Sequence, residues 1–209
     1  MMRRAWWMTL GLGLALVCYM LPWYTHDTAG FTTNAFDLAE WASIHPAVRS
    51  SSPPMLTSLL LRWPLVAVII GLALTANRFE DARVCWVVRG VALLLALRLI
   101  SPSDFFANAS DDPNYRQMAQ LTAASVIGIL VAIMLFRLAQ RWQNAVLVGV
   151  LLIGVLAGWQ GLADAGTLLD NFEIAVSIGP GIIGYTLCMG LVLMVAIWSK
   201  LSMRQPASF

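Results

Sequence analysis

Long apolar runs alternate with short polar segments along the whole chain. Six runs stand out, and each is close to the roughly 20 residues that an α-helix needs to cross a bilayer. They cover residues 5–21, 56–76, 84–100, 118–138, 145–163 and 178–198. Charges interrupt the third run, at Arg89 and Arg98. The pattern predicts an all-α integral membrane protein, with one transmembrane domain (1–209) folded as a bundle of six transmembrane helices.

Composition favours the same class of protein. Hydrophobic residues make up 59% of the chain and charged residues 11%, against about 45–50% and about 25% in an average soluble domain. Six spans leave little chain for a separate soluble domain. The net charge is only +2, and the basic residues form no patch that would suit a nucleic acid. We therefore expect the lipid bilayer, and no nucleic acid, as a partner.

The distribution of basic residues predicts the orientation in the membrane. One set of span ends carries Arg3, Arg4, Arg78, Arg83, Arg137, Arg141, Lys200 and Arg204. The opposite loops carry only Arg49 and Arg116. Cytoplasmic loops are enriched in Lys and Arg, so both termini are predicted to be cytoplasmic.

The first outer loop is predicted to contain a short amphipathic helix. Asn34 is placed to cap it, with Asp37 at the third position, and Pro46 ends it because the residue before a proline disfavours the α region. One face at helical spacing carries Leu38, Trp41, Ala42 and His45. Two interpretations stay open: a helix lying on the outer membrane surface, or a loop helix that caps the bundle.

Small residues mark helix-packing faces in the fourth and fifth runs. Ala124, Gly128 and Ala132 repeat every four residues, and Gly154 and Gly158 form a G-x-x-x-G pair. Small side chains at this spacing let helices approach closely. We expect these two neighbouring helices to pack on each other, in preference to forming a dimer seam.

Candidate residues for catalysis or metal binding are confined to the first outer loop. Its histidines and acidic residues are His26, Asp27, Asp37, Glu40 and His45. They match no metal-binding spacing, and the chain carries no catalytic motif in a functional context. No histidine lies inside a span to ligate haem, and no acid lies near a bilayer centre to couple protons. We expect no metal, cofactor or catalytic residues; a hydrolase or metal site on the outer face is the alternative.

Two arginines are the charges that most need an explanation. Arg62 and Arg98 lie toward the outer ends of the second and third runs. Either one alone can extend its side chain to the headgroups. Their shared depth on consecutive spans predicts a joint site for the phosphate of an anionic lipid or for a carboxylate of a partner.

In a pattern of aromatic, proline and glycine residues, the chain resembles small bacterial polytopic membrane proteins. It comprises Leu21-Pro22-Trp23 at the end of the first run, Gly30-Phe31 in the outer loop, and Gly179-x-Gly181, Gly184 and Gly190 in the last run. The resemblance implies a multi-pass protein of the bacterial plasma membrane, and it implies no activity.

Two classes of function are compatible with these features. The first is a non-catalytic accessory or structural subunit of a larger integral membrane complex, which would use its glycine-lined helices and outer loop for docking to other membrane subunits. The second is a small-solute or lipid transporter, or a lipid-binding membrane protein, with Arg62 and Arg98 lining its site.

Overall fold

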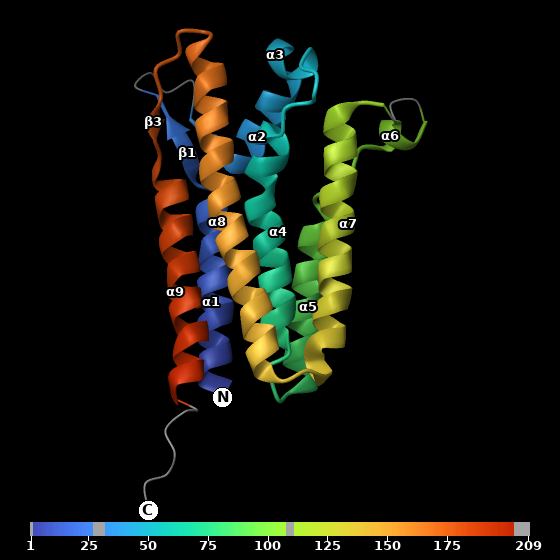
Figure 1. The fold of residues 1–209 in the computed structure, drawn as a ribbon, viewed down its shortest axis with the longest axis vertical. Coiled ribbons are helices and arrows are strands. Elements are labelled where there is room, and N and C mark those ends of the chain that lie inside the picture. The colour runs from blue at the N-terminus through green and yellow to red at the C-terminus, as the bar shows by residue number, and fades with distance from the viewer. Residues whose placement is uncertain (1, 27–31, 108–110, 203–209) are drawn as a thin grey trace, which may run out of the picture.

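Each of the six apolar runs forms a helix. The computed structural model describes residues 2–26, 32–107 and 111–202 (Figure 1). The long helices are α1 (Met2–Met20), α4 (Thr57–Ala76), α5 (Ala82–Leu97), α7 (Pro113–Met134, continued by the 3₁₀ turn η1, Leu135–Arg137), α8 (Gln140–Asp170) and α9 (Pro180–Ser202). Short helices are α2 (Ala35–Ile44), α3 (Pro46–Arg49) and α6 (Ser103–Ala107). The long helices run side by side as one bundle (Figure 1).

Among the described residues, four helices are long and apolar enough to cross a membrane. They are Thr57–Ala76, Pro113–Arg137, Gln140–Asp170 and Pro180–Trp198. The other two long helices, α1 and α5, are not among these four. Helix α1 has Arg3 and Arg4 in its first turn, which lower its mean hydropathy, and α5 has only 16 residues. Helix α8 has 31 residues, so it is longer than the predicted fifth span and includes Asp164 and Asp170, which were expected in a loop. The protein therefore has an all-α, membrane-type fold.

Helix α4 is the centre of the bundle. It packs against α8, α7, α5, α2 and α1, while α9 packs on α1 and α8 (Figure 1). Of its 20 residues, 16 are buried, as expected for a helix that is apolar on all sides. A polar side chain on α4 therefore faces other helices instead of lipid.

The two ends of the bundle differ in structure and charge. The sheet end carries α2, α3 and three short strands, β1 (Pro22–Thr25), β2 (Thr33–Asn34) and β3 (Ser177–Ile178). The arginine-rich end carries the N-terminus and six arginines, which are Arg3, Arg4, Arg78, Arg83, Arg137 and Arg141 (Figure 1). The side chain of Lys200, and Arg204 as a whole, lie outside the described residues.

The small sheet was not predicted, and it explains two glycines. Strand β1 pairs antiparallel with both β2 and β3, and the Gly179 amide donates to the Trp23 carbonyl at 2.8 Å. A Cβ on Gly179 would lie 2.4 Å from the Pro22 carbonyl oxygen, and one on Gly181 would lie 2.5 Å from the Trp23 ring. The segments Leu21-Pro22-Trp23 and Gly179-x-Gly181 of the sequence pattern thus contact each other; Gly30-Phe31 lies outside the described residues.

Helix α2 caps the bundle, which is one of the two interpretations that the sequence left open. Asn34 caps it, accepting from the Asp37 amide at 2.9 Å and donating to the Asp37 carboxylate at 2.8 Å. Leu38 and Ala42 are fully buried, and the helix packs mainly on α4. Its apolar face is therefore covered by protein, which argues against a helix lying on the membrane surface.

The small-residue faces of α7 and α8 pack on α4, which differs from the expected contact between the two neighbours. A Cβ on Gly128 would lie 2.6 Å from Ile70, and one on Gly154 would lie 2.4 Å from Ala67. Helix α4 lies between α7 and α8 and takes up both faces (Figure 1). On the same faces, Ala132 and Gly158 are buried and Ala124 is half-buried.

Candidate functional site

Arg62 is a fully buried cation inside the bundle. It lies on α4 at the sheet end, and its relative exposure is 0%. Its Nη1 donates to the Ser58 hydroxyl one turn earlier on the same helix and to the Asn114 side-chain oxygen at 2.8 Å. The sequence allowed Arg62 alone to extend its side chain to the headgroups. In the structure its position on the central helix turns the side chain inward, where it is fully buried.

Asn114 is held in place by the start of α7. Asp112 caps that helix. Its carboxylate accepts hydrogen bonds from the backbone amides of Asn114 at 2.8 Å and Tyr115 at 3.3 Å. The Asn114 side-chain oxygen also accepts from the Ser58 hydroxyl at 3.1 Å. Ser58, Arg62 and Asn114 thus form one polar contact between α4 and α7.

Arg98 belongs to the same cluster, although it is exposed. The Arg98 guanidinium lies over the ring of Phe36 on α2, with its central carbon 5.0 Å from the ring centroid, and that of Arg62 lies 5.7 Å from the same centroid. The structure thus brings the two predicted arginines together around one aromatic ring. Such cation–π contacts hold cations without neutralising them.

Arg62 forms no ion pair with an acidic residue in the described part of the chain, and the carboxylate of Glu40 acts on it only at longer range. Among the described residues, the one ion pair joins Arg116 to Asp111 at 3.4 Å. The Nε and Nη2 groups of Arg62 are buried and make no hydrogen bond to described residues. These two donors form one edge of the guanidinium, the planar fork that binds two oxygens of a carboxylate or phosphate.

Two half-buried arginines, Arg78 and Arg89, are better satisfied. Arg78 and Arg89 each leave only Nε buried without a partner, because Nη2 donates to Asn144 at 2.6 Å in Arg78 and to Asn77 at 2.8 Å in Arg89. Burial lowers the pKa of Arg78 to about 10, which leaves it charged at neutral pH. Of these three arginines, Arg62 is the one with two buried donors that have no hydrogen-bond partner among the described residues.

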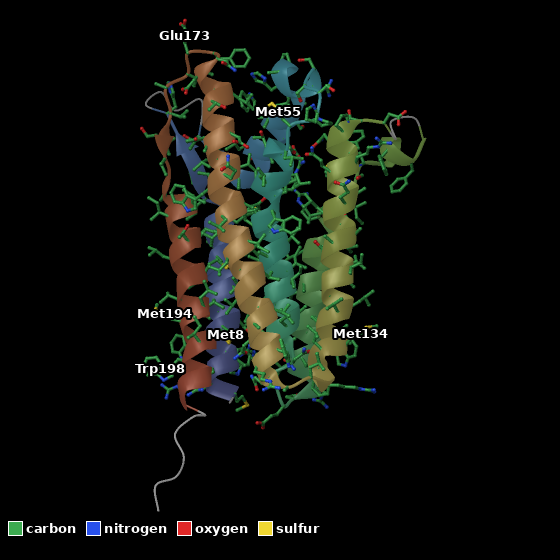
Figure 2. The ribbon with its side chains drawn as sticks, in the orientation of Figure 1. Met8, Met55, Met134, Glu173, Met194 and Trp198 are labelled. Carbon is green, nitrogen blue, oxygen red and sulfur yellow. The ribbon has the colours of Figure 1, made fainter. Side chains whose placement is uncertain are left out.

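A polar pocket lies beside the cluster. Its volume is about 200 Å³, and its lining includes Ser58 and Asn114, with Arg49, Asp112 and Gln117 around them. The side-chain oxygen of Gln117 is also buried without a hydrogen-bond partner among the described residues. Met55, labelled at the sheet end in Figure 2, is part of the wall. Two partners of Arg62 are therefore reached from this pocket.

The histidines and acids of the first outer loop make separate contacts where the structure describes them. The described residues contain no group of three or more His, Cys, Asp or Glu side chains that would suit a metal ion. His45 accepts from the Ala47 amide through Nδ1 at 3.1 Å and packs against Trp41 and Phe172. Asp37 bonds to the helix cap, Glu40 is exposed, and Asp27 lies outside the described residues. His26 is half-buried at the end of the sheet.

The sequence pointed to Arg62 and Arg98, and it missed the residues around them. Ser58 stands four positions before Arg62, a spacing that places both on one helix face, so this partner was predictable. Asn114 and Phe36 are brought in by tertiary packing, and no local pattern marks them. No family model, curated protein or solved structure matches this chain.

Proposed function

We propose that this protein binds an anionic group inside the membrane, at the sheet end of its bundle, through Arg62. The ligand class is a carboxylate or a phosphate, because the Nε–Nη2 edge of Arg62 offers two parallel donors. Arg98 contributes a second positive charge across the Phe36 ring. This function belongs to the class of small-solute or lipid binding and transport.

The unpartnered edge of Arg62 is the observation that carries this proposal. Leaving buried donors unsatisfied costs roughly 1–3 kcal/mol each, and more for charged groups. A bound anion would satisfy both donors and offset the buried charge. The pocket beside Ser58 and Asn114 offers an approach from the sheet end to the Nη1 side of the guanidinium. An anion at the Nε–Nη2 edge would also need the side chains that cover this edge to move, because Arg62 is fully buried.

Thermal stabilisation by small anions tests this function. The purified chain would be titrated with acetate and with inorganic phosphate at constant ionic strength, with chloride as the reference salt. A site occupied at a hundredfold excess over Kd stabilises a protein by about 2.7 kcal/mol. We expect such a rise for the wild type and a smaller one for Arg62→Lys, which keeps the charge and loses the fork.

Arg116→Gln is the matched control, since it removes a charge from the same end outside the cluster. It should keep the full response to acetate and phosphate. Equal melting temperatures in acetate, phosphate and chloride for the wild type would contradict the proposal.

We further propose that α1 and α5 complete a six-span bundle with both termini cytoplasmic, in a bacterial plasma membrane. Support comes from their packing alongside the four longer helices and from the arginines gathered at one end. The sheet end, with Arg62, then faces outward. An anionic group would enter from the outer leaflet or the outer aqueous phase.

Membership of a larger complex, as an accessory or structural subunit, stays a prediction. In such a complex, a carboxylate of a partner subunit would bind the Nε–Nη2 edge of Arg62, because it has the same chemistry as a small anion. Extraction in mild detergent distinguishes a carboxylate of a partner subunit from a lipid or a free anion. A stoichiometric partner lost in Arg62→Lys would favour the subunit; retained phospholipid or a response to free anions would favour direct ligand binding.

A further inference from the structure

A furrow runs along the bundle between α5 and α7. Its wider part, about 620 Å³, opens at the arginine-rich end beside Trp86, Arg89 and Arg137. Its narrower part, about 240 Å³, continues along the two helices between Leu93 and Ile129. The two parts share Trp86, Arg89 and Ile133, so they form one continuous feature. Met134, labelled in Figure 2, lies at the wider part.

The narrower part of the furrow is apolar. Apart from Arg89 at its end, it is lined by aliphatic and aromatic side chains and by Gly90. A Cβ placed on Gly90 would meet no atom within 4 Å. The space above Gly90 is therefore open, and a hydrocarbon chain lying there would contact apolar groups on both helices.

The wider part of the furrow is positively charged. Arg89 and Arg137 line it, against the single carboxylate of Glu80. The Arg89 guanidinium stacks on Trp86, 5.1 Å from the ring centroid, and its buried Nε has no hydrogen-bond partner among the described residues. Its Nη2 donates to Asn77, which in turn donates to the Ala132 carbonyl at 2.7 Å. Arg89 is thus held in place, and its buried Nε–H is still available to a ligand.

We propose that this furrow is a site for one anionic phospholipid of the leaflet at the arginine-rich end. One acyl chain lies over Gly90 between α5 and α7, and the phosphate contacts Arg89 and Arg137. The combination of an apolar trough with two cations and a tryptophan at its mouth matches the two parts of such a lipid. The site is separate from the Arg62 cluster and does not depend on it.

Lipid retention in native mass spectrometry tests the site. The intact chain would be reconstituted in an equimolar mixture of phosphatidylglycerol and phosphatidylcholine with identical acyl chains, then released into mild detergent. We expect one retained phosphatidylglycerol, favoured over phosphatidylcholine by about fivefold or more, since each cation near the headgroups favours anionic lipid to about this extent. Arg89→Gln and, independently, the exposed Arg137→Gln should bring that preference toward one.

Gly90 provides a matched pair of variants for the acyl chain. Gly90→Leu fills the furrow and should lower the retention of both lipids, while Gly90→Ala adds one methyl group in open space and should leave retention unchanged. Unchanged melting temperatures verify that the variants fold, and Arg137→Gln, at an exposed position, serves if Arg89→Gln does not fold.

Two outcomes would overturn the phospholipid site. Equal retention of the two lipids by the wild type would show annular lipid only. A stoichiometric polypeptide that accompanies the wild type from native membranes and is lost in Gly90→Leu would assign the furrow to a helix of a partner.

Discussion

Arg62 combines three properties that are costly together: full burial, a positive charge and an unsatisfied two-donor edge. Ser58 and Asn114 satisfy only its Nη1. An apolar side chain of similar length would suit the centre of the bundle better, because it would remove the buried donors. A residue that violates the rules of packing in this way is typical of a functional position.

Arg62→Met should therefore leave the ligand-free protein as stable as the wild type or more stable. Replacing buried ionic groups by apolar ones is often neutral or stabilising by about 1–4 kcal/mol. Thermal unfolding in chloride, without other anions, measures the difference. A loss of about 2 kcal/mol or more would show that the cation is structural, and the binding role would then lose its main support.

At the scale of elements, α4 organises the bundle. Close contacts with glycines of α7 and α8 set the distances of these two helices from α4. The sequence was sufficient to locate all six long helices and the cap at Asn34, because hydrophobic runs and capping residues are local signals. It could not show that α7 and α8 both pack on α4, since small residues reveal a close contact and not its partner. The strands were also missed, because two- to four-residue pairings carry no periodicity.

Gly154→Leu should destabilise the fold, whereas Gly149→Leu on the same helix should not. A Cβ at position 154 would overlap Ala67 of α4, and one at position 149 would meet nothing within 4 Å. Overpacking of this kind costs about 1–3 kcal/mol. Melting temperatures of the two variants in detergent give the comparison; equal values would mean that α8 does not pack on α4 through this face.

At the scale of the whole molecule, charge and structure are segregated along the bundle. The arginine-rich end presents basic residues and the proposed lipid furrow, while the sheet end presents α2, the strands and the Arg62 cluster. The same asymmetry that predicts the orientation therefore also predicts which solution or leaflet each site faces.

Cysteine labelling tests this orientation. Asn171 and Glu80 are exposed at opposite ends, and each would be replaced by cysteine in a variant whose native cysteines are serines. In intact cells, a membrane-impermeant maleimide should label Asn171→Cys directly and Glu80→Cys only after permeabilisation. The reverse pattern would invert the molecule. Labelling of both in intact cells would place the two positions on the same side and would contradict the three spans, α5, α7 and α8, proposed between them.

The Arg62 Nε–H group itself gives the most direct test of the central claim. In an ¹⁵N spectrum of arginine side chains, its resonance would be assigned by its loss in Arg62→Lys and followed during titration with acetate and with phosphate. We predict a saturable shift of this resonance, with Arg116 showing only the weak, non-saturating change of a surface group. An Arg62 resonance that stays in place at saturating anion, while the protein remains folded, would contradict the account.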